Sequence, residues 1–168
     1  HLVRALAKRG YRIRAAVRRP DPAGHLQPLG NVGQVMAMQA NLRYRWPVDR
    51  AVEGADQVVN LVGTLYGSGR QTFPAVHAFG AHAVAEAARG AGAGLTHVSA
   101  IGASKNSPSA YARSKAEGER AVHETVKDAV IFRPSIVFGP EDQFFNRFAN
   151  MARYSPFLQT LGGGKTRF

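Results

Sequence analysis

Apolar residues follow two different periods along this chain. Spacings of three and four predict helices, which we place at residues 1–9, 46–53, 72–89, 111–126 and 144–153. Short alternating or continuous apolar runs predict strands, which we place at residues 11–17, 35–38, 56–63, 95–99 and 129–132. Helices and strands therefore alternate along almost the whole sequence.

Breakers separate these elements. Gly10 ends the first helix, a loop follows at residues 20–24, and Ser107 with Pro108 supplies a capping hydroxyl and a first-turn proline for the helix that carries Tyr111. Further glycine-containing loops are expected at residues 63–70 and 162–165.

Strands that alternate with helices in units of roughly 30 residues favour a parallel sheet with helices on both faces, the doubly wound α/β fold. Ligands of such folds bind at the carboxyl ends of the strands, so we expect the loops at Arg18 and at residues 60–63, 99–102 and 133–140 to converge on one crevice. No internal repeat or linker divides the 168 residues, and we predict a single domain over 1–168.

Composition narrows the class of protein. The chain has no cysteine, which excludes disulfide scaffolds, cysteine-ligated metal sites and cysteine nucleophiles. The histidines show no metal-ligand spacing, so no metal site is expected. No apolar run is long enough to span a membrane, and the start lacks a signal-peptide core, so we expect a soluble, cytoplasmic protein.

The net charge of +11 is concentrated at the N-terminal end, where seven basic residues precede the first acid, Asp21. The charge run fits either the solvated face of a helix and strand or a patch that attracts phosphates or an anionic membrane. Only Tyr11 interleaves the basic residues, which argues against a platform for stacked bases. No DNA partner is expected, and RNA is the least favoured partner.

Tyr111 and Lys115 are four residues apart, which places the phenol and the ammonium on one face of the same helix. Free tyrosine has a pKa of about 10, and a nearby cation lowers it and makes proton exchange with a hydroxyl or carbonyl feasible. An ordinary surface pair would show the same spacing. The order of the neighbouring segments favours chemistry, because a strand ending in Ser99 precedes the pair and the Arg133–Pro134 loop follows it.

These residues resemble the short-chain dehydrogenase/reductase superfamily. The resemblance is to its extended or atypical branch, which is NAD-dependent epimerase/dehydratase-like. Within that branch the sequence is most similar to the bacterial relatives of the nucleotide-binding accessory subunit of respiratory complex I. The resemblance covers nearly the whole chain. It rests on four segments, NLVG at 60–63, VSAIGA at 98–103, YARSKAEGE at 111–119 and RPSIVFGPEDQFFNRF at 133–148.

The resemblance implies a role for each of three residues. Tyr111 would be the general acid/base, Lys115 would lower its pKa and hold the nicotinamide ribose, and Ser99 would hydrogen-bond the reacting oxygen. A structural reading stays open, in which Ser99 is simply a small residue that closes a strand.

The same resemblance implies a cofactor site. Asn60, Leu61, Val62 and Gly63 would pass beneath the ribose, and Pro134, Ser135, Ile136 and Val137 would contact the nicotinamide end. Asn60 could instead cap the loop that follows it.

Two arginines bear on the choice of cofactor. Arg18 stands where NADP-preferring members meet the 2′-phosphate, with Arg19 beside it, and Asn41 stands where many members hold the adenine with an aspartate. NADP(H) is therefore expected, and NAD stays open, as does the reading of Arg18 as an ordinary surface residue. The family's first strand and glycine-rich turn are expected to be missing here, because the chain opens inside the helix that follows them.

Two functions are expected from different classes. One is an NAD(P)-dependent oxidoreductase or epimerase acting on the carbonyl or alcohol carbon of an unknown small molecule. The other is a non-catalytic NADPH-binding accessory or assembly subunit of a membrane respiratory complex, located peripherally at the inner membrane, or in the mitochondrial matrix if the protein is eukaryotic.

Overall fold

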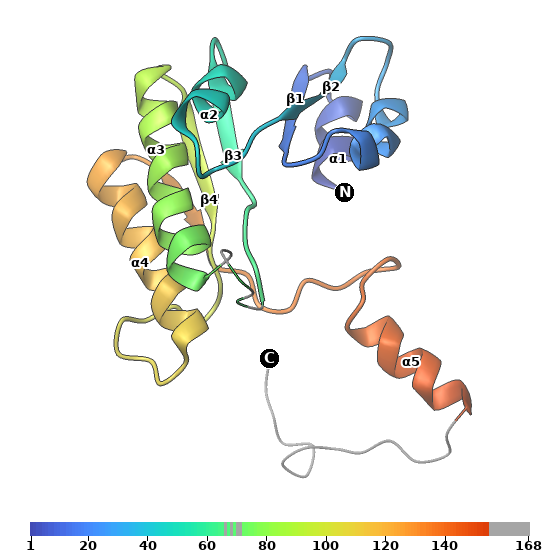
Figure 1. Cartoon of the computed structure of the whole chain (residues 1–168). Helices are drawn as coiled ribbons and strands as arrows, with labels where there is room; N and C mark the ends of the chain where they lie inside the picture. The colour runs from blue at the N-terminus through green and yellow to red at the C-terminus, as the bar shows by residue number, and fades with distance from the viewer. Residues whose placement is uncertain (66, 68, 70–71, 155–168) are drawn as a thin grey trace.

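The computed structural model describes residues 1–65, 67, 69 and 72–154 (Figure 1). In chain order its elements are α1 (Leu2–Lys8), β1 (Ile13–Val17), η1 (Asp21–Leu29), β2 (Val35–Gln39), α2 (Arg45–Val52), β3 (Gln57–Asn60), η2 (Pro74–Phe79), α3 (Gly80–Gly90), β4 (Gly94–Val98), α4 (Ala110–Thr125), β5 (Val130–Phe132) and α5 (Phe145–Tyr154). The alternating α/β order is as predicted. The glycine-rich stretch 162–165 and part of the 63–70 loop lie outside the described residues.

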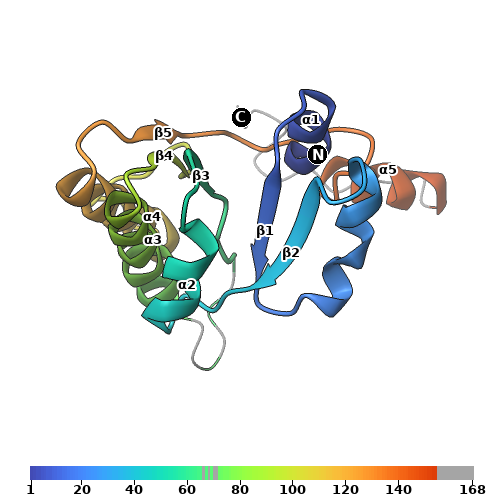
Figure 2. The same cartoon turned by 90° about the horizontal axis from the view of Figure 1, so that it is seen from above.

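The parallel pairing is confirmed, but the described strands form two sheets instead of one. β1 pairs with β2, and β3, β4 and β5 form a second parallel sheet in that order. The doubly wound order is 3-2-1-4-5-6, so the observed arrangement is that order without its central first strand. Figure 2 shows the two sheets apart, with α2 between them in the chain.

Helices α3 and α4 cover one face of the three-stranded sheet (Figure 1). Small alanine side chains let α3 approach its neighbours, and the buried core brings together Val48, Val52, Ala81, Val84, Ala85, Ala87, Ala88, Leu95, Val122 and Ala129. Helices were expected on both faces of the sheet. Among the described residues none covers the other face, where Val59, Val130 and Phe132 are exposed.

The elements differ from the predictions in several places, and side-chain hydrogen bonds account for two of the differences. β3 ends at Asn60, whose Oδ1 accepts the Val62 N–H at 3.0 Å and turns the chain out of the strand. α4 is capped by Ser109 and not by Ser107, since Ser109 Oγ accepts the Ala112 N–H at 3.4 Å. The predicted loop after Pro20 is the 3₁₀ helix η1, and the predicted long helix from residue 72 opens with the π-helical η2.

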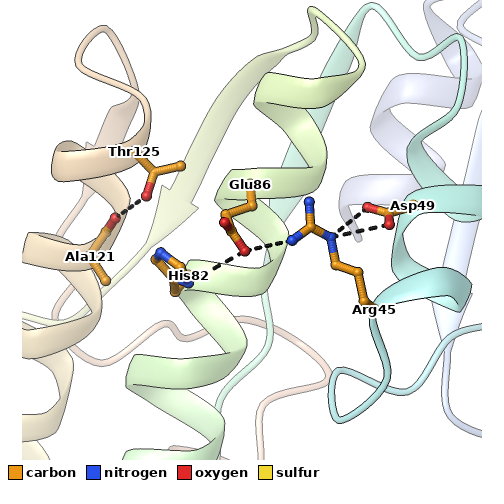
Figure 3. A network of polar contacts seen from close by, with 6 residues as sticks. All are labelled: Arg45, Asp49, His82, Glu86, Ala121 and Thr125. Carbon is orange, nitrogen blue, oxygen red and sulfur yellow. Dashed lines mark hydrogen bonds and ion pairs between the residues drawn. The ribbon is translucent and has the colours of Figure 1, made fainter.

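An ion-pair network joins α2 to α3 (Figure 3). Arg45 pairs with Asp49 on its own helix at 2.9 Å and with Glu86 on α3 at 2.6 Å, and His82 Nδ1 lies 3.6 Å from Glu86. The side chains are partly exposed, so we attribute orientation of α2 rather than much stability to this network.

Helix α5 lies apart from α3 and α4 in both views (Figures 1 and 2). It begins where Asp142 Oδ1 accepts the N–H groups of Phe144 and Phe145, at 2.9 and 2.6 Å. Within the described residues, no helix is both long and apolar enough to cross a lipid bilayer.

Candidate active site

Helix α4 turns one stripe of side chains toward the rest of the domain. The stripe has the three- and four-residue spacing of a helix face, and its members are Tyr111, Ser114, Lys115, Gly118, Glu119 and Val122. All of them are buried except Tyr111, which is half-buried. Polar residues on a buried helix face need partners, and these partners define the site.

Lys115 reaches the carboxyl end of β4. Its Nζ donates a hydrogen bond to the Val98 carbonyl oxygen at 3.1 Å, one residue before Ser99. A Cβ added at Gly63 would lie 3.6 Å from the same Nζ, so the loop after β3 passes directly over the ammonium. Burial lowers the pKa of Lys115, against the opposing attraction of Glu119.

Tyr111 packs in a cluster of rings. Its ring meets His77 edge-on, with centroids 5.4 Å apart, and Phe73 at 6.0 Å. Burial raises the pKa of the Tyr111 phenol, the opposite of the direction expected from the Tyr–Lys spacing. The Lys115 ammonium is held at the Val98 carbonyl, and burial is the cause of the raised pKa of the phenol.

Ser99 is buried at the end of β4. Its hydroxyl has no hydrogen-bond partner within the described residues, although it is near enough to Glu119 to help lower the pKa of that carboxyl group. A buried hydroxyl without a partner carries a desolvation cost that a ligand oxygen could relieve.

The loops after β4 and β5 are joined by backbone hydrogen bonds. Ser99 N–H donates to the Phe132 carbonyl at 2.7 Å, and Ile101 N–H donates to the Pro134 carbonyl at 2.9 Å. The segment Pro134, Ser135, Ile136 and Val137 therefore leaves the sheet beside Ser99.

Asn60 uses its whole side-chain amide within the protein. Nδ2 lies 3.1 Å from His97 Nδ1 on β4, while Oδ1 accepts the Val62 N–H. The residue thus shapes the loop after β3, in which Leu61, Val62 and Gly63 are exposed.

The expected phosphate and adenine residues belong to the other sheet. Arg18 and Arg19 follow β1 and are exposed, and neither pairs with a carboxylate of the described residues. Asn41 follows β2, where its Oδ1 accepts the Arg43 N–H at 3.1 Å. The site residues therefore fall in two groups, one at each sheet.

Three polar residues of the site, His77, Ser114 and Glu119, were not predicted as site residues, and Arg133 was expected only as part of the loop at the crevice. His77 and Ser114 hydrogen-bond each other at 2.9 Å, and Arg133 forms a two-pronged pair with Glu119 at 2.8 and 2.5 Å. Burial opposes ionisation of Glu119, but Arg133, Ser99 and His97 together outweigh it and hold the pKa of this carboxyl group below its usual value. The helix-face spacing from Tyr111 to Glu119 was the available signal.

In the part of the chain that the structure describes, no group of three or more histidine and acidic side chains is arranged to hold a metal ion.

A buried serine at the carboxyl end of a parallel strand, a buried lysine that reaches that end from helix α4, and exposed loops beside them are typical of a ligand-binding α/β domain. The model of the NAD(P)H-binding family matches residues 1–143, and the chain belongs to this family.

Sequence comparison with known proteins shows two groups of relatives within this family. The chain is 38% identical over 161 residues to a ceramide reductase of Caulobacter vibrioides, covering 96% of this chain and 50% of that protein. It is 33% identical over 171 residues to the mitochondrial NADH dehydrogenase (ubiquinone) 1 alpha subcomplex subunit 9 of Arabidopsis thaliana, covering 100% of this chain and 42% of that protein. These findings confirm the expected similarity to complex I accessory subunits, and the chain spans half or less of these relatives.

A solved structure shows the same fold. The triphenylmethane reductase of a Citrobacter species, in complex with NADP(H), superposes with a TM-score of 0.66 at 18% identity, covering 90% of this chain and 50% of that one. The Rossmann-type α/β class is thereby confirmed.

Proposed function

We propose that the chain is the dinucleotide-binding part of an NADP(H)-dependent reductase. The residues fit such a cofactor at both sheets. Two exposed guanidinium groups at Arg18 and Arg19 suit a 2′-phosphate in charge and geometry. Leu61, Val62 and Val137 expose apolar surface along the edge that holds Lys115, as the nicotinamide half requires.

The observation that carries the catalytic part is the position of Lys115, which links the Val98 carbonyl, next to Ser99, to the helix turn that bears Tyr111. When bound, the dinucleotide supplies the hydride. Ser99 Oγ donates a hydrogen bond to the substrate carbonyl oxygen, and Tyr111 gives its phenolic proton to that oxygen as the alcohol forms. Burial raises the pKa of Tyr111, so the phenol carries the proton that this step needs.

Lys115 would hold the ribose hydroxyls while its charge offsets the phenolate that remains after proton transfer. For this, Nζ exchanges part of its contact with Val98 for the cofactor. Gly63 keeps the space above Nζ open, since a side chain there would make van der Waals contact with the ammonium.

Tyr111→Phe in the intact protein tests this reaction. We expect NADPH oxidation with small carbonyl substrates to fall by on the order of 10²-fold or more, as loss of a general acid does, with NADPH affinity within about twofold. Tyr44→Phe, an exposed tyrosine outside the site, is the matched control. Equal turnover in wild type and Tyr111→Phe contradicts the assignment.

A second candidate function is an NADPH-binding subunit without turnover. It is favoured by the raised pKa of Tyr111, for which burial is the cause and the charge of Lys115 gives no compensation, and by the similarity to complex I subunits. Bound NADPH that stays reduced over hours with every carbonyl substrate, together with co-purification of the protein with a respiratory complex, would favour this candidate.

A further inference from the structure

The helix that packs against the Tyr111 turn opens in an unusual conformation. Residues Pro74–Phe79 form the π-helical η2 before α3 begins at Gly80. Isolated π turns are rare and occur often at functional sites. The turn places His77 against α4, where only 2% of the residue is exposed.

His77 links two separate parts of the site through a directional chain of hydrogen bonds. Its Nε2 accepts the Thr64 N–H at 3.0 Å, so in the neutral ring the proton is on Nδ1. Nδ1 then donates to Ser114 Oγ at 2.9 Å, and Ser114 Oγ donates to the Tyr111 carbonyl at 2.7 Å. One tautomer satisfies every contact from the loop after Gly63 to the Tyr111 backbone.

Ring packing adds a second restraint. The Phe73 ring stacks on His77 with centroids 5.6 Å apart, and the edge of the Tyr111 phenol meets both rings. Gly118 allows this close approach, because a Cβ there would lie 2.2 Å from the His77 carbonyl oxygen. The phenol and the histidine therefore cannot move independently.

We infer that His77 is a positioning residue, which holds the Tyr111 phenol and the Thr64 backbone in a fixed position relative to each other. The proposed general acid, Tyr111, and the loop after β3, which is expected to lie at the nicotinamide ribose, are therefore positioned by the same side chain. This inference rests on the proposed role of Tyr111. His77 itself touches neither substrate nor cofactor.

The charge state of His77 suits a fixed scaffold. Burial, together with the nearby charge of Lys115, lowers its pKa from 6.5 to about 4, so the ring stays neutral at physiological pH. A second proton would have to be on Nε2, facing the Thr64 N–H, where two donors would oppose each other.

The test compares two variants of the intact protein. His77→Phe keeps a ring of similar size but removes both hydrogen bonds, and Val122→Ala removes buried volume from the same face of α4 without touching the chain of hydrogen bonds. The signature is the titration of the Tyr111 phenol, followed by NMR of ¹³C-labelled tyrosine and assigned with Tyr111→Phe.

In His77→Phe, we expect the Tyr111 titration midpoint to fall toward the ordinary value for tyrosine, because the loosened phenol is less well shielded from water. Amide exchange at Thr64 should accelerate on the order of tenfold relative to the core of β4, as loss of one hydrogen bond implies. Val122→Ala should change neither the exchange rate of Thr64 relative to the core of β4 nor the titration midpoint of Tyr111. His77→Gln, whose amide oxygen can accept from Thr64, should restore most of the Thr64 protection.

Unchanged Tyr111 titration in His77→Phe, or an equal change in Val122→Ala, would overturn the inference. These measurements need no substrate and no turnover. Failure of the catalytic proposal is seen separately, in the turnover of Tyr111→Phe.

Discussion

Replacement of Gly118 by alanine tests how closely α4 and η2 approach each other. An added Cβ would lie 2.2 Å from the His77 carbonyl oxygen, 3.2 Å from its carbonyl carbon and 3.5 Å from Ala81 Cβ. The nearest neighbour is backbone, so no side chain can rotate away to make room. The two helical segments must separate.

The cost can be worked from these distances. Carbon and oxygen in close contact need roughly 3.3 Å, so the segments must move apart by about 1 Å. Overpacking of this kind costs about 1–3 kcal/mol, and we take the upper end because both partners are backbone. Alanine recovers about 1 kcal/mol of helix propensity over glycine, which leaves a net loss of about 2 kcal/mol.

Chemical denaturation followed by circular dichroism measures this loss, and thermal unfolding should show a Tm lower by about 4–8 °C. Gly90→Ala is the matched control, since Gly90 also lies in a helix but has nothing within 4 Å of an added Cβ. That variant should be as stable as wild type or more stable. A Gly118→Ala protein as stable as Gly90→Ala would refute the close approach of His77 to α4.

Three further predictions concern charge. The pKa values of buried His77 and His97 are lowered from 6.5 to about 4, so between pH 7 and pH 5 the unfolded chain binds protons that the folded chain does not. The free energy of unfolding should therefore fall by about 1–2 kcal/mol per histidine over this range, as measured by denaturant titration. The fall should be smaller in His97→Gln. Arg18→Ala should weaken NADPH binding roughly ten- to hundredfold in fluorescence titrations and leave NADH binding and the Arg12→Ala control unchanged. Glu119→Gln should destabilise the fold by about 1–3 kcal/mol and speed amide exchange after β5, because its guanidinium partner loses a buried anion.

Each of these has a contradicting result. A flat stability profile from pH 7 to pH 5 would mean that the two histidines are not buried as neutral rings. Equal losses of NADPH and NADH affinity in Arg18→Ala would remove the 2′-phosphate assignment. Unaltered exchange in Glu119→Gln would show that the ion pair does not hold the loop after β5.

Local pattern was enough to predict the elements and the helix that carries the Tyr–Lys pair. Alternation of Ile13, Ala15 and Val17 gave β1, and helix spacing put Tyr111 and Lys115 on one face. The split of the strands into two sheets was not predicted, because strand pairing is a long-range property that no single segment encodes.

The site was only partly predictable for the same reason. His77 lies in an alanine-rich segment whose pattern indicates an ordinary helix, and its partners are 13 and 37 residues away. Asn60 was recognised as either a loop cap or a ligand contact, and only the structure shows that both ends of its amide are already used.

The two hydrogen bonds from Ser99 and Ile101 to the carbonyls of Phe132 and Pro134 have a mechanical consequence. They extend the pairing of β4 and β5 past the ends of both strands, and proline, which has no N–H, still supplies the acceptor. The loop that carries the serine and the loop expected at the nicotinamide therefore form one rigid unit. A ligand that displaces one loop must displace the other. A substrate that shifts the Ser99 loop would therefore also shift the loop expected at the nicotinamide, through backbone hydrogen bonds alone.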